Sequence, residues 1–166
     1  RDVQRWRAVP SAHILMVQDP QKRRGIDEEE MQRRWPKTWA YLKRFEAILR
    51  QRSGFKKYFK TEKGPFYSIF NVGEYTFAPW KVVWRGEVAT SLVSAVINSD
   101  DRGKVIVPDQ TAYMVAFALM DAAYYLCALL NSSIVQVIYA MHTYKHVSMH
   151  FVQNIGIPKF DSTNPI

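Results

Sequence analysis

The chain has 166 residues, of which 48% are apolar, so it can bury one hydrophobic core or two lobes that share one. Its formal net charge is +8, and all of the excess lies in residues 1–63, which hold 17 Lys/Arg against 8 Asp/Glu, whereas residues 64–166 hold 6 against 7. Cys127 is the single cysteine, which excludes a disulfide framework and a thiolate metal site and fits a reducing cytoplasm.

The first part of the chain predicts a short strand followed by two helices. Residues 13–18 form a brief apolar run that ends in a turn, which is typical of a buried strand. Asp27 is a suitable N-cap for a helix that Pro36 stops. A wide apolar stripe at helical spacing then predicts a second helix over 38–52, which Ser53-Gly54 closes.

The second part of the chain predicts a β-rich region followed by helices. Turn residues separate five short runs, which we assign to strands over 66–70, 81–85, 88–97, 105–107 and 111–117. Two helices follow, over about 121–130 and 132–141. The sequence therefore predicts an α+β fold: a mixed or antiparallel sheet of about five strands, with the N-terminal helices and the two C-terminal helices packed on it.

One stretch, residues 112–141, is apolar enough to be compared with a membrane span. Polar residues such as Asp121, Asn131 and Gln136 interrupt it at intervals shorter than the ~20 apolar residues that a span requires. We therefore interpret it as a buried strand followed by core helices, and we reject a transmembrane assignment.

Motifs for catalysis or metal binding are missing from the sequence. The seven glycines stand singly at turns, without a Gly-rich nucleotide loop, and no nucleophile–base or paired-carboxylate set stands out. His142, His146 and His150 would share one face of a continuous helix, a geometry that could hold zinc. No cysteine or carboxylate lies nearby to complete the set, so we expect these residues to be polar loop residues and expect no metal.

The basic first part of the chain predicts contact with a polyanion, through phosphate contacts and counterion release. Within it, residues 55–63 alternate aromatic residues with four lysines: Lys56, Lys57, Lys60 and Lys63. We assign these lysines to DNA phosphates and the neighbouring rings to the core. A basic surface that is merely solvated, or one that binds an anionic membrane, remains an alternative.

From about Pro36 onward the sequence resembles the TaqI-like C-terminal specificity domain of type II and related Eco57I-like N6-adenine DNA methyltransferases. The most specific match is Tyr75-Thr-Phe-Ala-Pro-Trp-Lys, and the other matching stretches are 36–42, 49–52, 66–84, 125–133 and 155–160. The family pattern has tyrosine where this chain has Trp80. The resemblance covers roughly three-quarters of the chain.

The resemblance implies a target-recognition domain that grips duplex DNA and reads bases for a separate methyltransferase domain of the same polypeptide. That upstream domain would bind S-adenosylmethionine and flip the adenine, so this chain itself would hold no cofactor and catalyse no step. The Asn-Pro-Pro-aromatic run expected of such an active site is missing here. The chain also begins at Arg1 rather than methionine, and we expect it to be a piece of a longer cytoplasmic protein, with 1–63 as a basic helical part and 64–166 as the specificity domain.

DNA contacts are expected from both parts of the chain. The candidates are Lys56, Lys57, Lys60, Lys63, Tyr67, Tyr75, Lys81, Arg85, Tyr144, Lys145 and His146. Two binding modules are alternatives: the specificity subunit of a type I restriction system, whose long spacer helices are not visible here, and a protein-interaction domain whose basic face binds an acidic partner. A small zinc enzyme built on the three histidines is a third.

Overall fold

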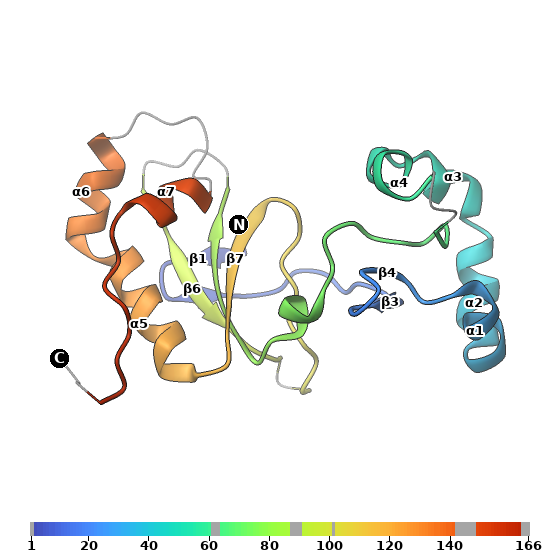
Figure 1. Cartoon of the computed structure of the whole chain (residues 1–166), viewed down its shortest axis with the longest axis horizontal. Helices are drawn as coiled ribbons and strands as arrows, with labels where there is room; N and C mark the ends of the chain where they lie inside the picture. The colour runs from blue at the N-terminus through green and yellow to red at the C-terminus, as the bar shows by residue number, and fades with distance from the viewer. Residues whose placement is uncertain (1, 61–63, 87–90, 101, 142–148, 164–166) are drawn as a thin grey trace. The chain divides into compact units, whose positions relative to one another are not determined.

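The structure is a computed structural model that describes residues 2–60, 64–86, 91–100, 102–141 and 149–163 (Figure 1). Its contacts divide the chain into two compact units. We call Ile14–Thr76 the helical unit, and Arg1–His13 together with Phe77–Ile166 the sheet unit. The expected division between residues 63 and 64 stays a prediction; the contacts place the boundary after Thr76 and join the first residues to the sheet.

The helical unit contains a short antiparallel strand pair and four short helices. Its elements are β3 (Gln18–Asp19), β4 (Arg24–Gly25), α1 (Glu28–Arg34), α2 (Pro36–Lys43), α3 (Glu46–Gln51) and α4 (Ser53–Tyr58), and the 3-10 helix η1 (Glu74–Phe77) follows at its end. Three glutamates fill the first turn of α1 and two arginines its last turn, which suits the helix dipole. Pro36 occupies the first turn of α2, where its missing N–H costs nothing.

An aromatic cluster forms the core of the helical unit. The buried members are Val17, Met31, Leu42, Phe66 and Tyr67. Trp39 packs on two of them, with its ring centroid 5.5 Å from Phe66 and 6.2 Å from Tyr67. Aromatic pairs in these tilted and edge-on arrangements stabilise a core beyond the area that they bury.

Arg52 ties the helices of this unit to the loop that follows them. Its guanidinium donates to the carbonyl oxygens of Leu49 (2.9 Å), Phe66 (3.0 Å) and Ser68 (3.0 Å). Burial lowers the pKa of the guanidinium, which nevertheless stays charged at neutral pH. This cation therefore serves the fold.

The sheet unit is built on a three-stranded antiparallel sheet in the order β6-β5-β7. Its elements are β1 (Val3–Gln4), β2 (Arg7–Ala8), β5 (Trp80–Arg85), β6 (Ser94–Ile97), β7 (Ala112–Phe117), α5 (Met120–Asn131), α6 (Ser133–Met141) and α7 (Met149–Asn154). Because both faces of β5 are covered, its four inner residues are all buried, in place of the usual alternation.

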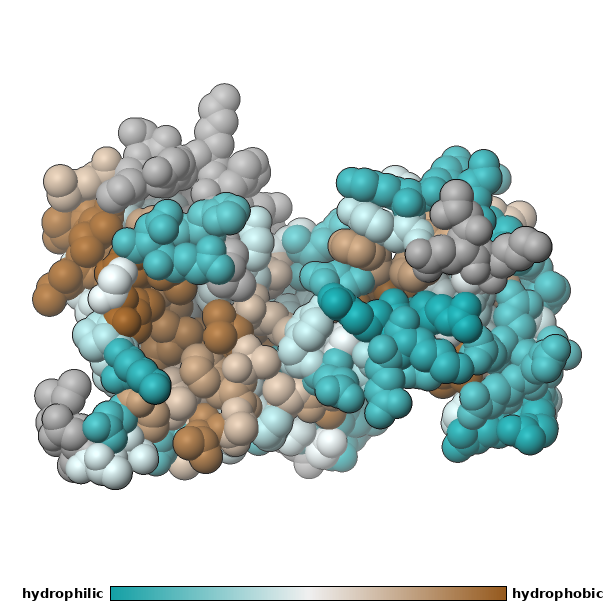
Figure 2. Space-filling model, in the orientation of Figure 1, coloured by the Kyte–Doolittle hydropathy of each residue, from teal (hydrophilic) through white to brown (hydrophobic). Residues whose placement is uncertain are grey.

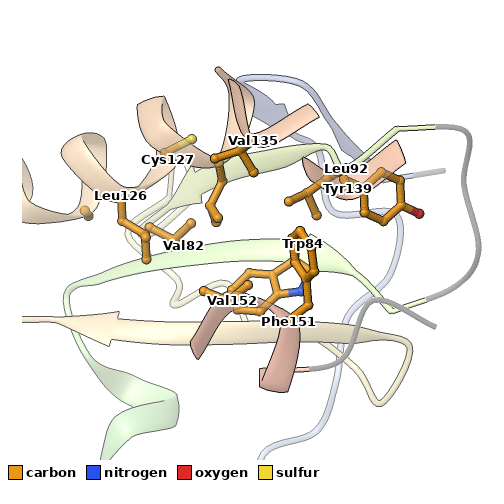
Figure 3. Close-up of a cluster of buried hydrophobic side chains, with 11 residues drawn as sticks. Val82, Trp84, Leu92, Leu126, Cys127, Val135, Tyr139, Phe151 and Val152 are labelled. Atoms are coloured by element: carbon orange, nitrogen blue, oxygen red, sulfur yellow. The ribbon is translucent and has the colours of Figure 1, made fainter. Parts of the chain in front are cut away.

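Helices cover one face of this sheet and the β1–β2 hairpin covers the other. Val82 and Trp84 of β5 belong to a cluster with α5, α6 and α7, in which Leu126 and Val135 also lie (Figure 3). Val83, one step along β5, packs in a second cluster that includes β1 and β2 residues. Because successive side chains of a strand point to opposite faces, β5 contributes residues to two separate cores.

A side-chain amide fixes α5 to β6. The Asn131 Nδ2 donates to the Ser94 carbonyl oxygen (2.9 Å), and its Oδ1 accepts from the Ser94 N–H (3.1 Å). Asn131 and Ser94 are both buried, so this pair satisfies a backbone donor and acceptor that water does not reach.

The predicted helices are confirmed in part. The expected helix ending at Pro36 is α1, although the Asp27 carboxylate binds Lys22 and Arg24 and does not cap the helix. The single helix expected over 38–52 is wrong, because a tightened turn separates α2 from α3: the Phe45 N–H bonds to the Leu42 carbonyl, three residues back.

The expected end of that helix at Ser53-Gly54 is also wrong. Ser53 is the first residue of α4, because extended backbone at Arg52 breaks the chain direction one residue earlier. In the sheet unit, α5 and α6 match the two predicted C-terminal helices within a residue or two, and α7 was not predicted.

The α+β class is confirmed, but fewer of the expected strands appear. The runs 81–85 and 111–117 are β5 and β7, and the run 88–97 contributes β6, with residues 88–90 outside the described part. The run 66–70 is a turn and loop that is buried only at residues 66–68. The run 13–18 gives only the first residue of β3, and 105–107 makes one bridge, from Val105 to Ser99. Apolar runs signal burial, which a loop packed on a core also provides.

No single helix within the described ranges is long and apolar enough to cross a membrane. The pair α5 and α6 passes that test jointly, on length and composition alone, with a bend of 53° between the two helices.

Candidate nucleic-acid interface

Residues 53–60, which contain α4, turn two phenylalanines inward and three lysines outward. We call Lys56, Lys57 and Lys60 the α4 lysines. Phe55 and Phe59, four residues apart, are each 5% exposed, and their ring centroids lie 6.2 Å apart. Lys56, Lys57 and Lys60 are all exposed, so they lie on the solvent side of this segment. The alternation of aromatic residues and lysines in the sequence thus becomes a buried side and a cationic side.

These three lysines have no acidic partner among the residues that the structure describes. Five other cations of the helical unit are paired: Lys22 and Arg24 with Asp27, Arg34 with Glu30, and Lys43 and Arg50 with Glu46. By sequence, residues 14–76 hold 14 Lys/Arg and 8 Asp/Glu. The free excess therefore includes the α4 lysines, which lie on a unit whose visible surface is mostly hydrophilic (Figure 2).

A stacked pair of rings adjoins the lysines. The rings of Tyr58, at the end of α4, and Phe70 lie 3.6 Å apart between centroids and are tilted by only 10°. The Lys57 Nζ lies 5.0 Å from the Tyr58 centroid. Phe70 is 49% exposed, so one apolar ring face stays open beside the cationic side of α4.

Polar groups continue this surface past Phe70. The Tyr75 hydroxyl donates to Asn71, whose carbonyl oxygen and side-chain oxygen lie 2.6 and 2.7 Å away. The Arg23 guanidinium donates to the same Asn71 side chain at 3.3 Å and lies 5.7 Å from the Tyr75 ring centroid. A Cβ at Gly73 would meet the Tyr75 ring at 2.8 Å, so glycine is required there for this ring position.

Two predicted DNA contacts lie in the interior. Tyr67 is 3% exposed, its hydroxyl donates to the Ile26 carbonyl, and burial together with the nearby Glu28 and Asp27 raises its pKa. Lys81 is fully buried, donates to the Ala78 carbonyl at 2.7 Å, and has its pKa lowered by burial. We therefore assign both residues to packing and leave them out of the interface.

Arg85 belongs to the sheet unit. It lines a cavity of about 320 Å³ between the sheet and the β1–β2 hairpin. Its Nε is buried without a hydrogen-bond partner in the described part of the structure. The remaining predicted contacts, Lys63, Tyr144, Lys145 and His146, lie outside the described residues.

Metal binding has no candidate in the described ranges, where no group of three or more His, Cys, Asp or Glu side chains is arranged to hold an ion. His142 and His146 of the histidine series lie outside those ranges, and His150 is exposed.

No family model matches the sequence. The chain is similar to the type II methyltransferase M.NspV of Nostoc sp., with 36% identity over 105 residues. This match supports a relationship to type II methyltransferases. It covers 63% of this chain but only 21% of the relative's length.

Sequence reasoning missed Phe70 and its polar neighbours Arg23 and Asn71. The sequence predicts a strand that includes Phe70, and it assigns no contact to Arg23 or Asn71. One signal was present: an aromatic residue directly followed by Asn-Val-Gly indicates a ring at the edge of a turn, where side chains are exposed.

Proposed function

We propose that this chain is the DNA target-recognition part of a restriction-modification adenine-N6 methyltransferase. It would hold duplex DNA sequence-specifically, in the cytoplasm, for an S-adenosylmethionine-dependent catalytic domain of the same polypeptide. The observation that carries the proposal is the cationic side of α4, where Lys56, Lys57 and Lys60 are exposed and have no acidic partner in the described structure. The similarity to a type II methyltransferase also supports this proposal.

The physical argument rests on what such an enzyme requires. A base inside a duplex cannot reach an active site, so it must leave the stack at a cost of a few kcal/mol. Phosphate contacts from lysines can hold the duplex during that step, and they act on every sequence. Base recognition would then come from other residues, for which Arg85 of the sheet unit and Tyr75 of the helical unit stay candidates.

Binding to a random 20-base-pair duplex, measured at 50 and 200 mM salt by fluorescence anisotropy, tests the proposal. We expect binding that weakens steeply with salt, because each phosphate contact releases counterions. A control with an acidic protein at the same ionic strength separates DNA binding from a general preference for acidic partners. Absence of duplex binding at 50 mM salt would exclude the proposed function.

A second candidate function is contact with another protein, and one observation favours it. Exposed apolar residues gather on α5 and α6 (Figure 2): Tyr124 is 53% exposed, Ile134 72%, Val137 60% and Met141 77%. Exposed apolar patches often mark interaction surfaces. In the proposed function such a patch would suit contact with the catalytic domain. Sedimentation of the wild-type chain and of the Ile134→Glu variant tests whether the chain also self-associates through this patch.

A further inference from the structure

The open ring face of Phe70 is unusual among the exposed aromatic residues of the helical unit. Tyr41, exposed to a similar degree at 52%, packs edge-on against Phe45, with 63° between the rings. Phe70 instead lies parallel to Tyr58 at 3.6 Å, which covers one of its faces. Its exposed area therefore includes the flat opposite face, which is the geometry that stacking on a planar ligand requires.

The ring behind Phe70 is held firmly in place. Tyr58 belongs to α4, which is anchored by the buried Phe55, and Tyr58 itself is half-buried. Because Phe70 fills one face of Tyr58 at 3.6 Å, the Lys57 ammonium at 5.0 Å has room only on the other side of that ring. Lys57, Tyr58 and Phe70 thus form a layered set that a further flat ring can extend.

The surroundings of this set select the ligand by charge. Lys56 and Lys60 are exposed, lie two residues before and after Tyr58 in the sequence, and suit a phosphate backbone. Asn71 directly follows Phe70 and is hydrogen-bonded to Arg23 and Tyr75, so polar groups also lie near the ring. The ligand that suits this set has a flat aromatic group, a nearby anion and polar edges, and these are the features of a nucleotide. Aromatic side chains beside cations commonly bind unpaired bases by stacking.

We propose that Phe70 stacks on a nucleobase that has left the helical stack of the bound DNA. This inference rests on the proposed function and deepens it, because bases inside an intact duplex have no free face. It assigns Phe70 to the recognition of a disrupted base position, and the α4 lysines to the adjoining phosphates. The chain would then distinguish an unstacked base from paired duplex by ring stacking, because its ionic contacts are the same with both.

Three 20-base-pair duplexes test this proposal with the 166-residue chain: one fully paired, one with a single bulged thymidine, and one with a bulged abasic nucleotide. The two bulges share their backbone and differ only in the base. We expect the wild-type chain to bind the thymidine bulge at least about fivefold more tightly than the abasic bulge, since stacking on one base is worth about that factor or more.

Variants assign the preference to the ring. Phe70→Leu keeps an apolar side chain but removes the ring, and it should bind both bulges equally while its salt dependence on paired duplex is unchanged. Phe70→Tyr should restore the preference, and Tyr41→Ala, the matched exposed ring, should keep it. A circular dichroism melt of each variant confirms that it is folded.

Equal binding of the two bulges by the wild-type chain would overturn the assignment of Phe70, and so would a preference that survives in Phe70→Leu. Neither result would affect the proposed function. Binding to none of the three duplexes at 50 mM salt would overturn the proposed function as well. The two failures are therefore distinguishable.

Discussion

Neutralising the α4 lysines will flatten the salt dependence of DNA binding. The triple variant Lys56→Ala, Lys57→Ala, Lys60→Ala removes three exposed cations that have no acidic partner in the described structure, so little stability should be lost, about 0.5 kcal/mol or less per site. If each lysine contacts one phosphate, the slope of log K against log salt should fall by about 2.7.

The size of this effect makes the assay decisive. A slope difference of about 2.7 over a fourfold change in salt corresponds to a ratio of about 40. Anisotropy titrations of a 20-base-pair duplex between 50 and 200 mM salt should therefore show the wild-type affinity falling about 40-fold further than that of the variant. The matched control is Arg33→Ala, Lys37→Ala, Arg44→Ala, which removes three other exposed cations of the same unit. A wild-type slope in the lysine variant, or an equal loss in the control, would refute the assignment of α4.

Three further predictions concern the fold that presents this surface. Arg52→Met should lower the free energy of unfolding by about 3 kcal/mol in urea titrations, because three carbonyl oxygens lose a charged donor; a loss under about 1 kcal/mol would contradict its bridging role. Asn131→Asp should destabilise the sheet unit by about 2 kcal/mol at neutral pH, since a carboxylate cannot donate to the Ser94 carbonyl, and an unchanged melting temperature would argue against that bond. Burial raises the pKa of the Cys127 thiol, so it should stay protonated and unreactive toward iodoacetamide at pH 8 in the folded chain and react after unfolding; rapid alkylation of folded protein would show that it is accessible.

Elements with strong local signals could be predicted from the sequence. Charge order around residues 28–34 and the polar break at Asn131-Ser132 mark α1 and the α5–α6 junction, because caps and dipole preferences act within one turn. The strands β5 and β7 follow from apolar runs between turn residues. The strand predicted at Phe66 and Tyr67 is wrong, since a buried loop and a buried strand can share one composition.

The candidate site depended more on tertiary structure. The α4 lysines were predictable because they are close in sequence and bury nothing. Burial of Lys81 was not, because it depends on strands β6 and β7, which pair with β5 only in the fold. The stacking of Phe70 on Tyr58 joins residues from separate segments, and a periodic sequence pattern does not predict such a contact.

Amide hydrogen exchange of the 166-residue chain, with and without a 20-base-pair duplex, tests the central claim most directly. Protection on DNA binding should concentrate in residues 53–60 and 69–75, the α4 and Phe70 surface of the helical unit. Unchanged exchange in both segments, with protection confined to the sheet unit or found nowhere, would contradict the proposal that this surface holds DNA.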